Sequence, residues 1–310
     1  MSTVTALLIA LGIISGIFIV VWAIYLRGTL AASNRDHVNP ALGPQIGVGF
    51  FANFMDTLGV GSFAITSSIY KLLNAIPDDL IPGTMNVGHA LPTVTEAFIF
   101  LILLGGTVDP RTLAAMIAAA VLGAYFGAGI VSGWPKRKIQ IGLGIALIAA
   151  AILMLGSVLK FIPIGGDANG LTGTKFFIAV AANFFFGAIQ QLGVGLYAPC
   201  MILIYLLGMN QRAAFPIMMG SCAFLMPVGG YKFIKARRYS PKAALGLTLG
   251  GIPAVFLAAF IVKSLPLTYV KWLVVFVVLY TAIMLLRSAM TESAAEAAAR
   301  SRAPNANPAD

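Results

Sequence analysis

The chain has 310 residues, of which 59% are hydrophobic and only 10% are charged. Soluble globular domains carry about 25% charged residues, so this composition excludes an ordinary soluble protein and indicates a membrane solvent. The net charge of +10 could suit nucleic acid, but the Lys and Arg residues lie in short stretches between apolar segments, where they orient a membrane protein. The composition predicts an all-α polytopic membrane protein and no nucleic-acid partner.

Seven apolar segments are long enough to cross a bilayer as helices. The first, Val4 to Leu26, has no basic residue before its apolar run, so we expect a retained transmembrane helix and not a cleaved signal. The other six are Pro82 to Leu104, Thr112 to Trp134, Ile139 to Leu159, Ala213 to Tyr231, Ala243 to Val262 and Val270 to Leu286.

Two further apolar stretches, 45–73 and 176–209, are longer than one crossing needs. Each is interrupted by the tetrapeptide Leu-Gly-Val-Gly, at 58–61 (the first break) and at 192–195 (the second break). Glycine pairs of this kind weaken a continuous helix. We therefore expect both stretches to be broken in the middle.

The breaks belong to an internal duplication. Sliding the chain over itself by 134 residues makes 11 of the 36 positions from Phe50 to Met85 identical. A shift of 131 then pairs Pro110 with Pro241. An ungapped register that keeps a tetrapeptide is better explained by duplication than by chance.

Loop charge bears on whether the two copies run parallel or inverted. If each break is the tip of a re-entrant hairpin, each copy has three spans and the second is upside down; if each stretch crosses, the copies are parallel. The re-entrant arrangement puts 14 of the 20 Lys and Arg residues in the cytoplasm, whereas the crossing arrangement puts one of the basic clusters, 136–138 or 232–242, outside. We therefore expect about seven transmembrane helices plus two glycine-broken re-entrant segments in an inverted repeat.

This interpretation divides the chain into four parts. Residues 1–43 form an N-terminal transmembrane helix and a cytoplasmic loop, and 44–159 form the first copy. Residues 160–287 form the second copy, and 288–310 form a cytoplasmic tail to which we assign no chemistry.

The two breaks are the expected binding site. Unpaired backbone groups are not tolerated in lipid, so an interruption at membrane depth must be packed in protein or line a wet cavity. An inverted repeat brings the breaks together near the midplane, where each new half-helix offers free N–H groups and its positive dipole end to an anion. The expected substrate-binding residues are Gly59, Val60, Gly61, Ser62, Asn86, Gln191, Gly193, Val194, Gly195 and Tyr197. The alternative is that these glycines serve only close helix packing, as expected for Gly123/Gly127 and Gly246/Gly250.

Polar residues form a stripe on the span that follows Pro82. Asn86, His89, Thr93 and Glu96 are three, four and three residues apart, which places them on a single helical face. Ionisable groups inside spans are costly and usually face a pathway or a partner. A structural role for each residue alone stays open.

Asp56, just before the first break, joins His89 and Glu96 as the expected coupling residues. The aligned positions in the second copy are Gln190, Ala223 and Gly230, so the ionisable side chains belong to the first copy. The second copy offers neutral donors in their place, namely Gln190, Gln191, Tyr197, Ser221 and Cys222. Such a site suits a small anion that is held weakly.

The sequence lacks motifs of catalysis and metal binding. Cys200 and Cys222 are its only cysteines, and it contains no HExxH, no GxSxG and no Cys/His cluster with metal spacing. We therefore expect no enzyme, no metal and no cofactor. An intramembrane enzyme or an assembly factor is the alternative from another class.

The two halves together resemble the TauE/SafE sulfite exporter family of membrane permeases. The resemblance rests on the broken helices NFMDTLGVGSF and GAIQQLGVGLYAP, on the proline-initiated helices IPGTMNVGHALP and FPIMMGSCAFLMP that follow them, and on the duplication. It covers about residues 44–287, and the polar DT and QQ before the breaks depart from the plainer pattern of many relatives. The resemblance implies export or exchange of sulfite, sulfonates or related small anions.

The expected function is that of a permease or exporter in the cell (inner) membrane, moving a small anion, most of all sulfite or an organosulfonate, between the two breaks. An inside-negative potential drives a monoanion outward by roughly 2.3 kcal/mol per 100 mV, so export needs no further energy source. The alternative is a proton-coupled importer of a small organic or sulfur-containing anion. The expected partners are the anion and the lipid bilayer, with a homodimer as a candidate assembly.

Overall fold

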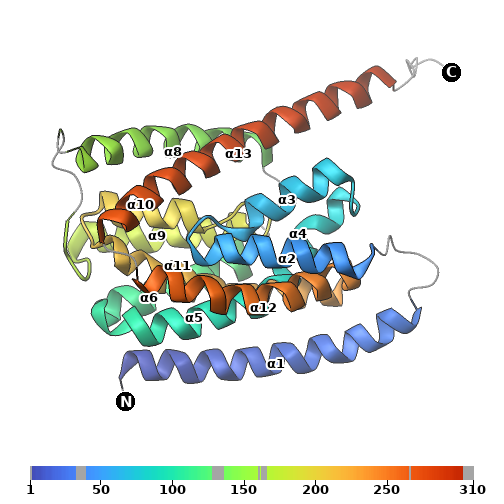
Figure 1. The fold of residues 1–310 in the computed structure, drawn as a ribbon, viewed down its shortest axis with the longest axis horizontal. Helices are drawn as coiled ribbons and strands as arrows, with labels where there is room; N and C mark the ends of the chain where they lie inside the picture. The colour runs from blue at the N-terminus through green and yellow to red at the C-terminus, as the bar shows by residue number, and fades with distance from the viewer. Residues whose placement is uncertain are drawn as a thin grey trace.

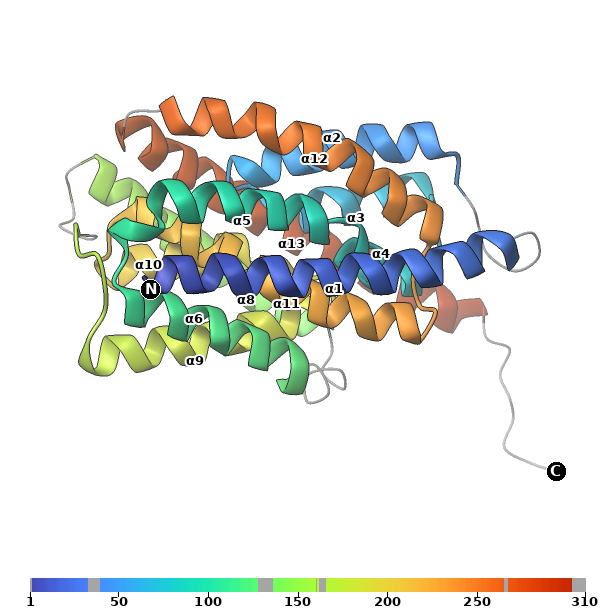
Figure 2. The ribbon, with the colours of Figure 1, turned by 90° about the horizontal axis from the view of Figure 1, so that it is seen from below.

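The structure, a computed structural model, describes residues 2–32, 40–127, 136–159, 161, 166–264 and 267–302. In these ranges it consists of helices and their connecting loops, with an isolated β-bridge between Ala168 and Met209. The longer helices lie roughly side by side along one axis (Figure 1, Figure 2). The α-helices and the π-helix are α1 (Thr3–Ala32), α2 (Leu42–Thr57), α3 (Ser62–Leu73), α4 (Ile81–Gly88), α5 (Ala90–Leu104), α6 (Pro110–Leu122), the π-helix η3 (Gly123–Gly127), α8 (Lys136–Val158), α9 (Gly173–Gln190), α10 (Tyr197–Leu206), α11 (Ala214–Lys235), α12 (Pro241–Ser264) and α13 (Leu267–Arg302). Three short 3-10 helices are η1 (Asp78–Leu80), η2 (Gly105–Thr107) and η4 (Gln211–Ala213).

Five stretches within the described ranges are long and apolar enough to cross a membrane. They are Thr3–Arg27, Asp78–Thr107, Gly173–Gln190, Gln211–Lys235 and Pro241–Ile261. Four of them coincide with expected spans, whereas Gly173–Gln190 is α9, the first arm of the second broken stretch. This length and apolarity are those of a membrane-embedded protein.

The other three expected spans fall on α6, α8 and α13. Within the residues that the structure describes, their apolar stretches are shorter than a full crossing, at Pro110–Phe126, Gln140–Ala149 and Val275–Thr291. The expected segment Thr112 to Trp134 runs past residue 127 and ends outside the described residues.

Both broken stretches fold as helical hairpins. α2 ends at the first break, and α3 returns beside it toward the end from which α2 came (Figure 1). In the second stretch, Lys175 near the start of α9 donates through Nζ to the carbonyl of Leu207, just after α10, at 3.0 Å. The start of α9 and the end of α10 therefore lie together, and a break forms the tip of each hairpin.

The two hairpins open toward opposite ends of the molecule (Figure 1). The second hairpin opens where the N–H of Asp109 donates to Asn169 O at 2.7 Å. The first opens at the other end, where the N–H of Ser240 donates to Thr84 Oγ1 at 2.8 Å. This other end, called the basic end below, carries the stretch from Lys232 to Lys242 and the start of α8.

Each hairpin packs mainly on a helix from the opposite half of the chain. α2 lies against α12, and α9 lies against α6 and η3. Glycine permits both contacts, since a Cβ at Gly49, Gly246 or Gly250 would collide with the facing backbone or side chain in the first, and one at Gly123 or Gly187 would do so in the second. The expected packing role is thereby confirmed for Gly123, Gly246 and Gly250.

α11 is the most deeply enclosed of the five membrane-length stretches. Of its most apolar window, 89% is buried, compared with 22% for α1, which lies at the outside. α5 packs against α11, and α8 against α13. The centre of the molecule is therefore built from α5, α11 and the two hairpin tips.

Candidate functional site

The first glycine of each break terminates a helix. The N–H of Gly59 donates to Asp56 O at 2.7 Å, and that of Val60 donates to Met55 O at 2.9 Å. The second break repeats both bonds, from Gly193 to Gln190 and from Val194 to Ile189. With φ of 97° at Gly59 and 85° at Gly193, both breaks are Schellman caps, in which a left-handed glycine satisfies the last carbonyls of a helix.

The two hairpin tips meet inside the molecule. A Cβ on Gly61 would lie 3.8 Å from the Cβ of Tyr197, and one on Gly195 would lie 3.6 Å from the Cβ of Phe63. Phe63 and Tyr197 each stand two residues after the second glycine of their own break. Each break therefore faces the first turn of the opposite half-helix, and the contact is reciprocal.

A small inner cavity lies between the tips. Its lining residues are Asp56, Gly61, Ser62, Phe63, Thr93, Gln190, Gly195, Leu196, Tyr197, Cys222 and Met226. Its volume of about 10 Å³ is close to the minimum for one water molecule, roughly 10–15 Å³. The cavity is smaller than any sulfur oxyanion, which would have to widen it.

Asp56 occupies the N-terminus of α3. Its Oδ1 accepts the N–H of Ser62, the first residue of α3, at 2.6 Å, and its Oδ2 accepts the Ser62 hydroxyl at 3.0 Å. A carboxylate is favoured there because it complements the helix dipole. This differs from the expectation of a free N-terminus, since the chain's own carboxylate already takes the Ser62 N–H.

Glu96 links the two hairpins. Its Oε1 lies 2.8 Å from the hydroxyl of Thr57 at the end of α2, and its Oε2 accepts the hydroxyl of Tyr197 at the start of α10, also at 2.8 Å. Glu96 and Tyr197 are both buried. One carboxyl group of α5 thus reaches the tips of both hairpins.

His89 ties the first hairpin to the junction of α4 and α5. Its Nε2 lies 2.9 Å from the Thr66 hydroxyl, and its Nδ1 lies 3.1 Å from Asn53 Oδ1. The Asn53 amide donates through Nδ2 to Gly49 O at 2.7 Å, so Oδ1 faces the ring and Nδ1 carries the proton. A neutral ring then accepts from Thr66 through Nε2, and no carboxylate contacts it among these bonds.

The structure brings only part of the expected binding set to a cavity. Gly61, Ser62, Gly195 and Tyr197 line the inner cavity. Gly59 and Val194 do not line it, and neither do Asn86 and Gln191; Val60 and Gly193 line the neighbouring vestibule described below.

Asn86 and Gln191 point elsewhere for identifiable reasons. Asn86 donates through Nδ2 to Pro82 O at 2.9 Å, one turn back on its own helix. Gln191 lies where a Cβ of Gly229 would stand, so its amide packs against α11.

Besides Asp56, three cavity residues, Thr93, Gln190 and Cys222, carry polar atoms that the expected binding set omitted. The hydroxyl of Thr93 is buried without a hydrogen-bond partner and borders the cavity. Gln190 accepts the Cys222 thiol through Oε1 at 3.2 Å. The stripe spacing already contained Thr93, and the repeat register contained Gln190, but neither pattern indicates which side chain borders a space.

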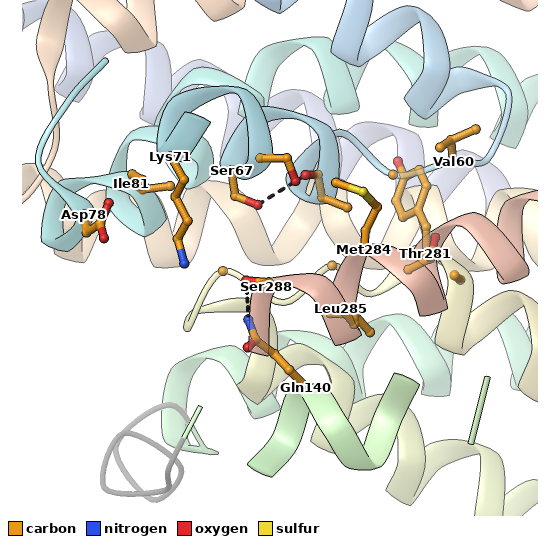
Figure 3. A pocket seen from close by; sticks show the side chains of 17 residues that line it. Val60, Ser67, Lys71, Asp78, Ile81, Gln140, Thr281, Met284, Leu285 and Ser288 are labelled. Atoms are coloured by element: carbon orange, nitrogen blue, oxygen red, sulfur yellow. Dashed lines mark hydrogen bonds between the residues drawn. The ribbon is translucent and has the colours of Figure 1, made fainter. Parts of the chain in front are cut away.

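A second hollow, the vestibule, lies between the breaks and the basic end (Figure 3). Its volume is about 40 Å³, and its polar lining consists of Ser67, Ser68, Lys71, Asp78, Gln140, Tyr197, Thr281 and Ser288. Gln140 donates through Nε2 to Ser288 at 3.1 Å, while its buried Oε1 and the buried hydroxyl of Thr281 have no partner. Lys71 extends from α3 toward this space (Figure 3).

The vestibule and the inner cavity share one wall. Gly61, Gly195 and Tyr197 line both spaces. The residues that bring the hairpin tips together therefore also separate the vestibule near the basic end from the smaller inner cavity.

Comparison with protein-family models, with curated proteins and with solved structures finds no match. Among the described residues, no group of three or more His, Cys, Asp or Glu is placed to hold a metal ion. The arrangement offers two buried carboxyl groups, several hydroxyl and amide groups, and the start of α10 around a small space.

Proposed function

We propose that this chain is a multi-pass permease of the cell (inner) membrane that moves a small anion, with sulfite or an organosulfonate as the leading substrate. The observation that carries the proposal is the reciprocal meeting of two glycine breaks around a small cavity in an apolar helical protein. Non-helical backbone at membrane depth is retained where it lines a cavity or a pathway.

The hairpin geometry supports a topology of seven spans and two re-entrant hairpins in an inverted repeat. In this topology α1, α4–α5, α6, α8, α11, α12 and α13 cross the bilayer, and α2–α3 and α9–α10 enter from opposite sides. α9 is long enough to cross alone, but α10 returns the chain to the end where α9 began. The positive-inside rule then places the basic end in the cytoplasm.

The anion would pass from the cytoplasmic vestibule to the inner cavity. Lys71 and the hydroxyl groups of the vestibule attract it, and the partnerless hydroxyl of Thr93 and the first turn of α10 receive it in the cavity. Neutral donors bind a small anion without trapping it. Sulfite and organosulfonates come first because the resemblance in the broken helices implies them.

One observation favours the second candidate function, proton-coupled import. Asp56 lines the inner cavity, and Glu96 is hydrogen-bonded to its wall at Tyr197. An anion about 4 Å from a carboxylate is repelled by roughly 4 kcal/mol at an effective dielectric constant near 20. A proton that arrives with the anion removes one such repulsion, whereas electrogenic export without a proton leaves both.

The proposed site is tested by narrowing it without straining the backbone. Gly195 is the better position, because its φ is not in the left-handed region and a Cβ there would make only an ordinary contact with Phe63. Gly195→Leu should lower sulfite flux into proteoliposomes at least tenfold, while Gly195→Ala retains most of it.

Gly47→Leu on α2 is the matched control, since nothing lies within 4 Å of a Cβ at Gly47. Unchanged flux in well-folded Gly195→Leu would refute transport between the breaks. A thermal-shift screen with sulfite, sulfate, thiosulfate, sulfoacetate and small carboxylates ranks the substrates, because a ligand of the folded state raises its stability.

A further inference from the structure

We propose that Glu96 carries the proton that accompanies the anion, and that Asp56 and His89 do not. This inference rests on the proposed permease function in its second form, proton-coupled import, and deepens it by assigning the coupling proton to one residue. It is carried by the hydrogen bonds at Thr57, Tyr197 and Ser62.

The hydroxyl of Thr57 has one hydrogen and lies near two oxygen atoms that can accept it. It lies 2.9 Å from the carbonyl of Asn53, which can only accept, and 2.8 Å from Glu96 Oε1. If Glu96 is ionised, Thr57 donates to Oε1, and the Asn53 carbonyl does without the hydroxyl. If Glu96 is protonated, Oε1 donates to Thr57, which then donates to Asn53.

Both protonation states of Glu96 are therefore satisfied without movement of the backbone. Tyr197 donates to Oε2 in either state, because only Oε1 changes its role. A buried carboxyl group without such an arrangement would lose a hydrogen bond on gaining or losing its proton. Glu96 is built to exchange a proton.

Asp56 is held as a carboxylate by the start of α3. Its Oδ1 faces the backbone N–H of Ser62, which has no lone pair with which to accept a proton, and the helix dipole favours the charged form. Protonating Oδ2 would also displace the hydrogen of the Ser62 hydroxyl that now points to it. The hydrogen bonds of Asp56 as the cap of α3 thus favour its charged form.

His89 is held in one neutral tautomer. Its Nδ1–H is used by Asn53, whose orientation is set by the bond to Gly49, and its Nε2 accepts from Thr66. A second proton would oppose the Thr66 hydrogen and would gain no carboxylate partner. His89 positions the first hairpin but carries no coupling proton.

The charges around Glu96 make the proton necessary. The titratable groups that interact with it in the described part of the chain are Asp56 on α2, Tyr197 on α10 and Cys222 on α11, and none is a cation. Lys71 lines the vestibule but not the inner cavity, and Tyr197 lies in the wall between the two spaces. Because the bonds to Ser62 favour a charged Asp56, an anion becomes acceptable when Glu96 is neutral, and the pair crosses as one proton with one monoanion.

The test separates coupling from transport in proteoliposomes of the purified chain. Methanesulfonate serves as the probe, because it stays a monoanion across the pH range and cannot carry the proton itself. Wild type should exchange labelled methanesulfonate in counterflow and accumulate it when the outside is acidic. Glu96→Gln should exchange at a rate within about threefold of wild type but lose accumulation, while Asp56→Asn and His89→Gln, if folded, keep a response to the pH gradient.

Infrared spectroscopy of the purified protein provides a readout that needs no transport. The C=O band of a protonated carboxyl group should be present in wild type, absent in Glu96→Gln and retained in Asp56→Asn. Tyr197→Phe keeps the ring but removes the donor to Oε2, so it should shift the pH of half-maximal uptake upward by about one unit. This second variant keeps the test decisive if Glu96→Gln does not fold.

Three results would overturn the assignment. They are wild-type uptake that ignores the pH gradient, accumulation that survives in Glu96→Gln, and a carboxyl band that persists in that variant. If the wild-type protein exchanges neither methanesulfonate nor sulfite, the permease function itself is refuted. The absence of counterflow distinguishes this result from a wrong assignment of the proton to Glu96.

Discussion

The first break is followed by α3, whose first N–H is capped by the carboxylate of Asp56, whereas the second break is followed by α10, which begins at Tyr197. Both end the preceding helix with the same Schellman bonds. After that point they differ: Asp56 caps Ser62 in the first, while its counterpart Gln190 accepts only a thiol in the second. The backbone conformation of the break is therefore repeated, but the charged side chain is not. The first tip is stabilised by hydrogen bonds within its own hairpin, whereas Gln190 at the second tip bonds to Cys222 on α11.

The backbones also differ at the second glycine. Gly61 has φ of 85°, but Gly195 is not in the left-handed region. α3 therefore begins directly at Ser62, whereas Leu196 still intervenes before α10 begins at Tyr197. The duplicated tetrapeptide thus has two left-handed glycines, Gly59 and Gly61, in the first break and one, Gly193, in the second.

The largest expected effect comes from removing the carboxylate. Asp56→Ala leaves the buried N–H and hydroxyl of Ser62 without an acceptor and should lower the free energy of unfolding by about 3 kcal/mol. Gln190→Ala, the matched change at the second break, removes a bond to a weak thiol donor and should cost about 1 kcal/mol. Thermal unfolding of both variants in detergent measures the difference, and equal losses would contradict the asymmetry.

An intermediate effect is expected from the backbone. Gly61→Ala forces an L-residue into the left-handed region and should destabilise the protein by about 1–2 kcal/mol. Gly195→Ala should change the stability by less than about 0.5 kcal/mol, since its Cβ would meet Phe63 at an ordinary distance. The same unfolding assay applies, and a larger loss at Gly195 would reverse the comparison.

The smallest effect is expected from Lys71, which gives the first half-helix a charge that the second lacks. Lys71→Gln should raise the KM for sulfite about threefold at low ionic strength, and the difference should vanish near 0.5 M salt because screening removes long-range attraction. Lys242→Gln, at the start of α12 and outside the vestibule lining, is the control. A change that persists at high salt would point to direct contact with the substrate.

Helix positions and breaks were accessible from the sequence because their causes are local. Apolar length predicts the helices, and a repeated Leu-Gly-Val-Gly predicts where two of them stop. The 3.6-residue period also placed His89, Thr93 and Glu96 on one face, and the structure shows all three turned toward the hairpins or the cavity.

The hydrogen-bond partners of individual side chains, and the cavities that they line, could not be predicted from the sequence in the same way. The period that joins Asn86 to the stripe does not say that its amide bonds back to Pro82. The place of Gln191 beside the break predicts a binding residue, but its side chain occupies the space left by Gly229 on α11. The vestibule combines residues of α3, α8, α10 and α13, so no local pattern predicts it.

The exchanged packing of the hairpins has a consequence for assembly. α2 is seated in α12 through Gly49, Gly246 and Gly250, and α9 is seated in α6, so neither half of the chain holds the partner of its own first arm. Halves made as separate chains should be stable only when produced together. A protein with a single copy would face the same need, and could meet it only by pairing with a second molecule inserted upside down.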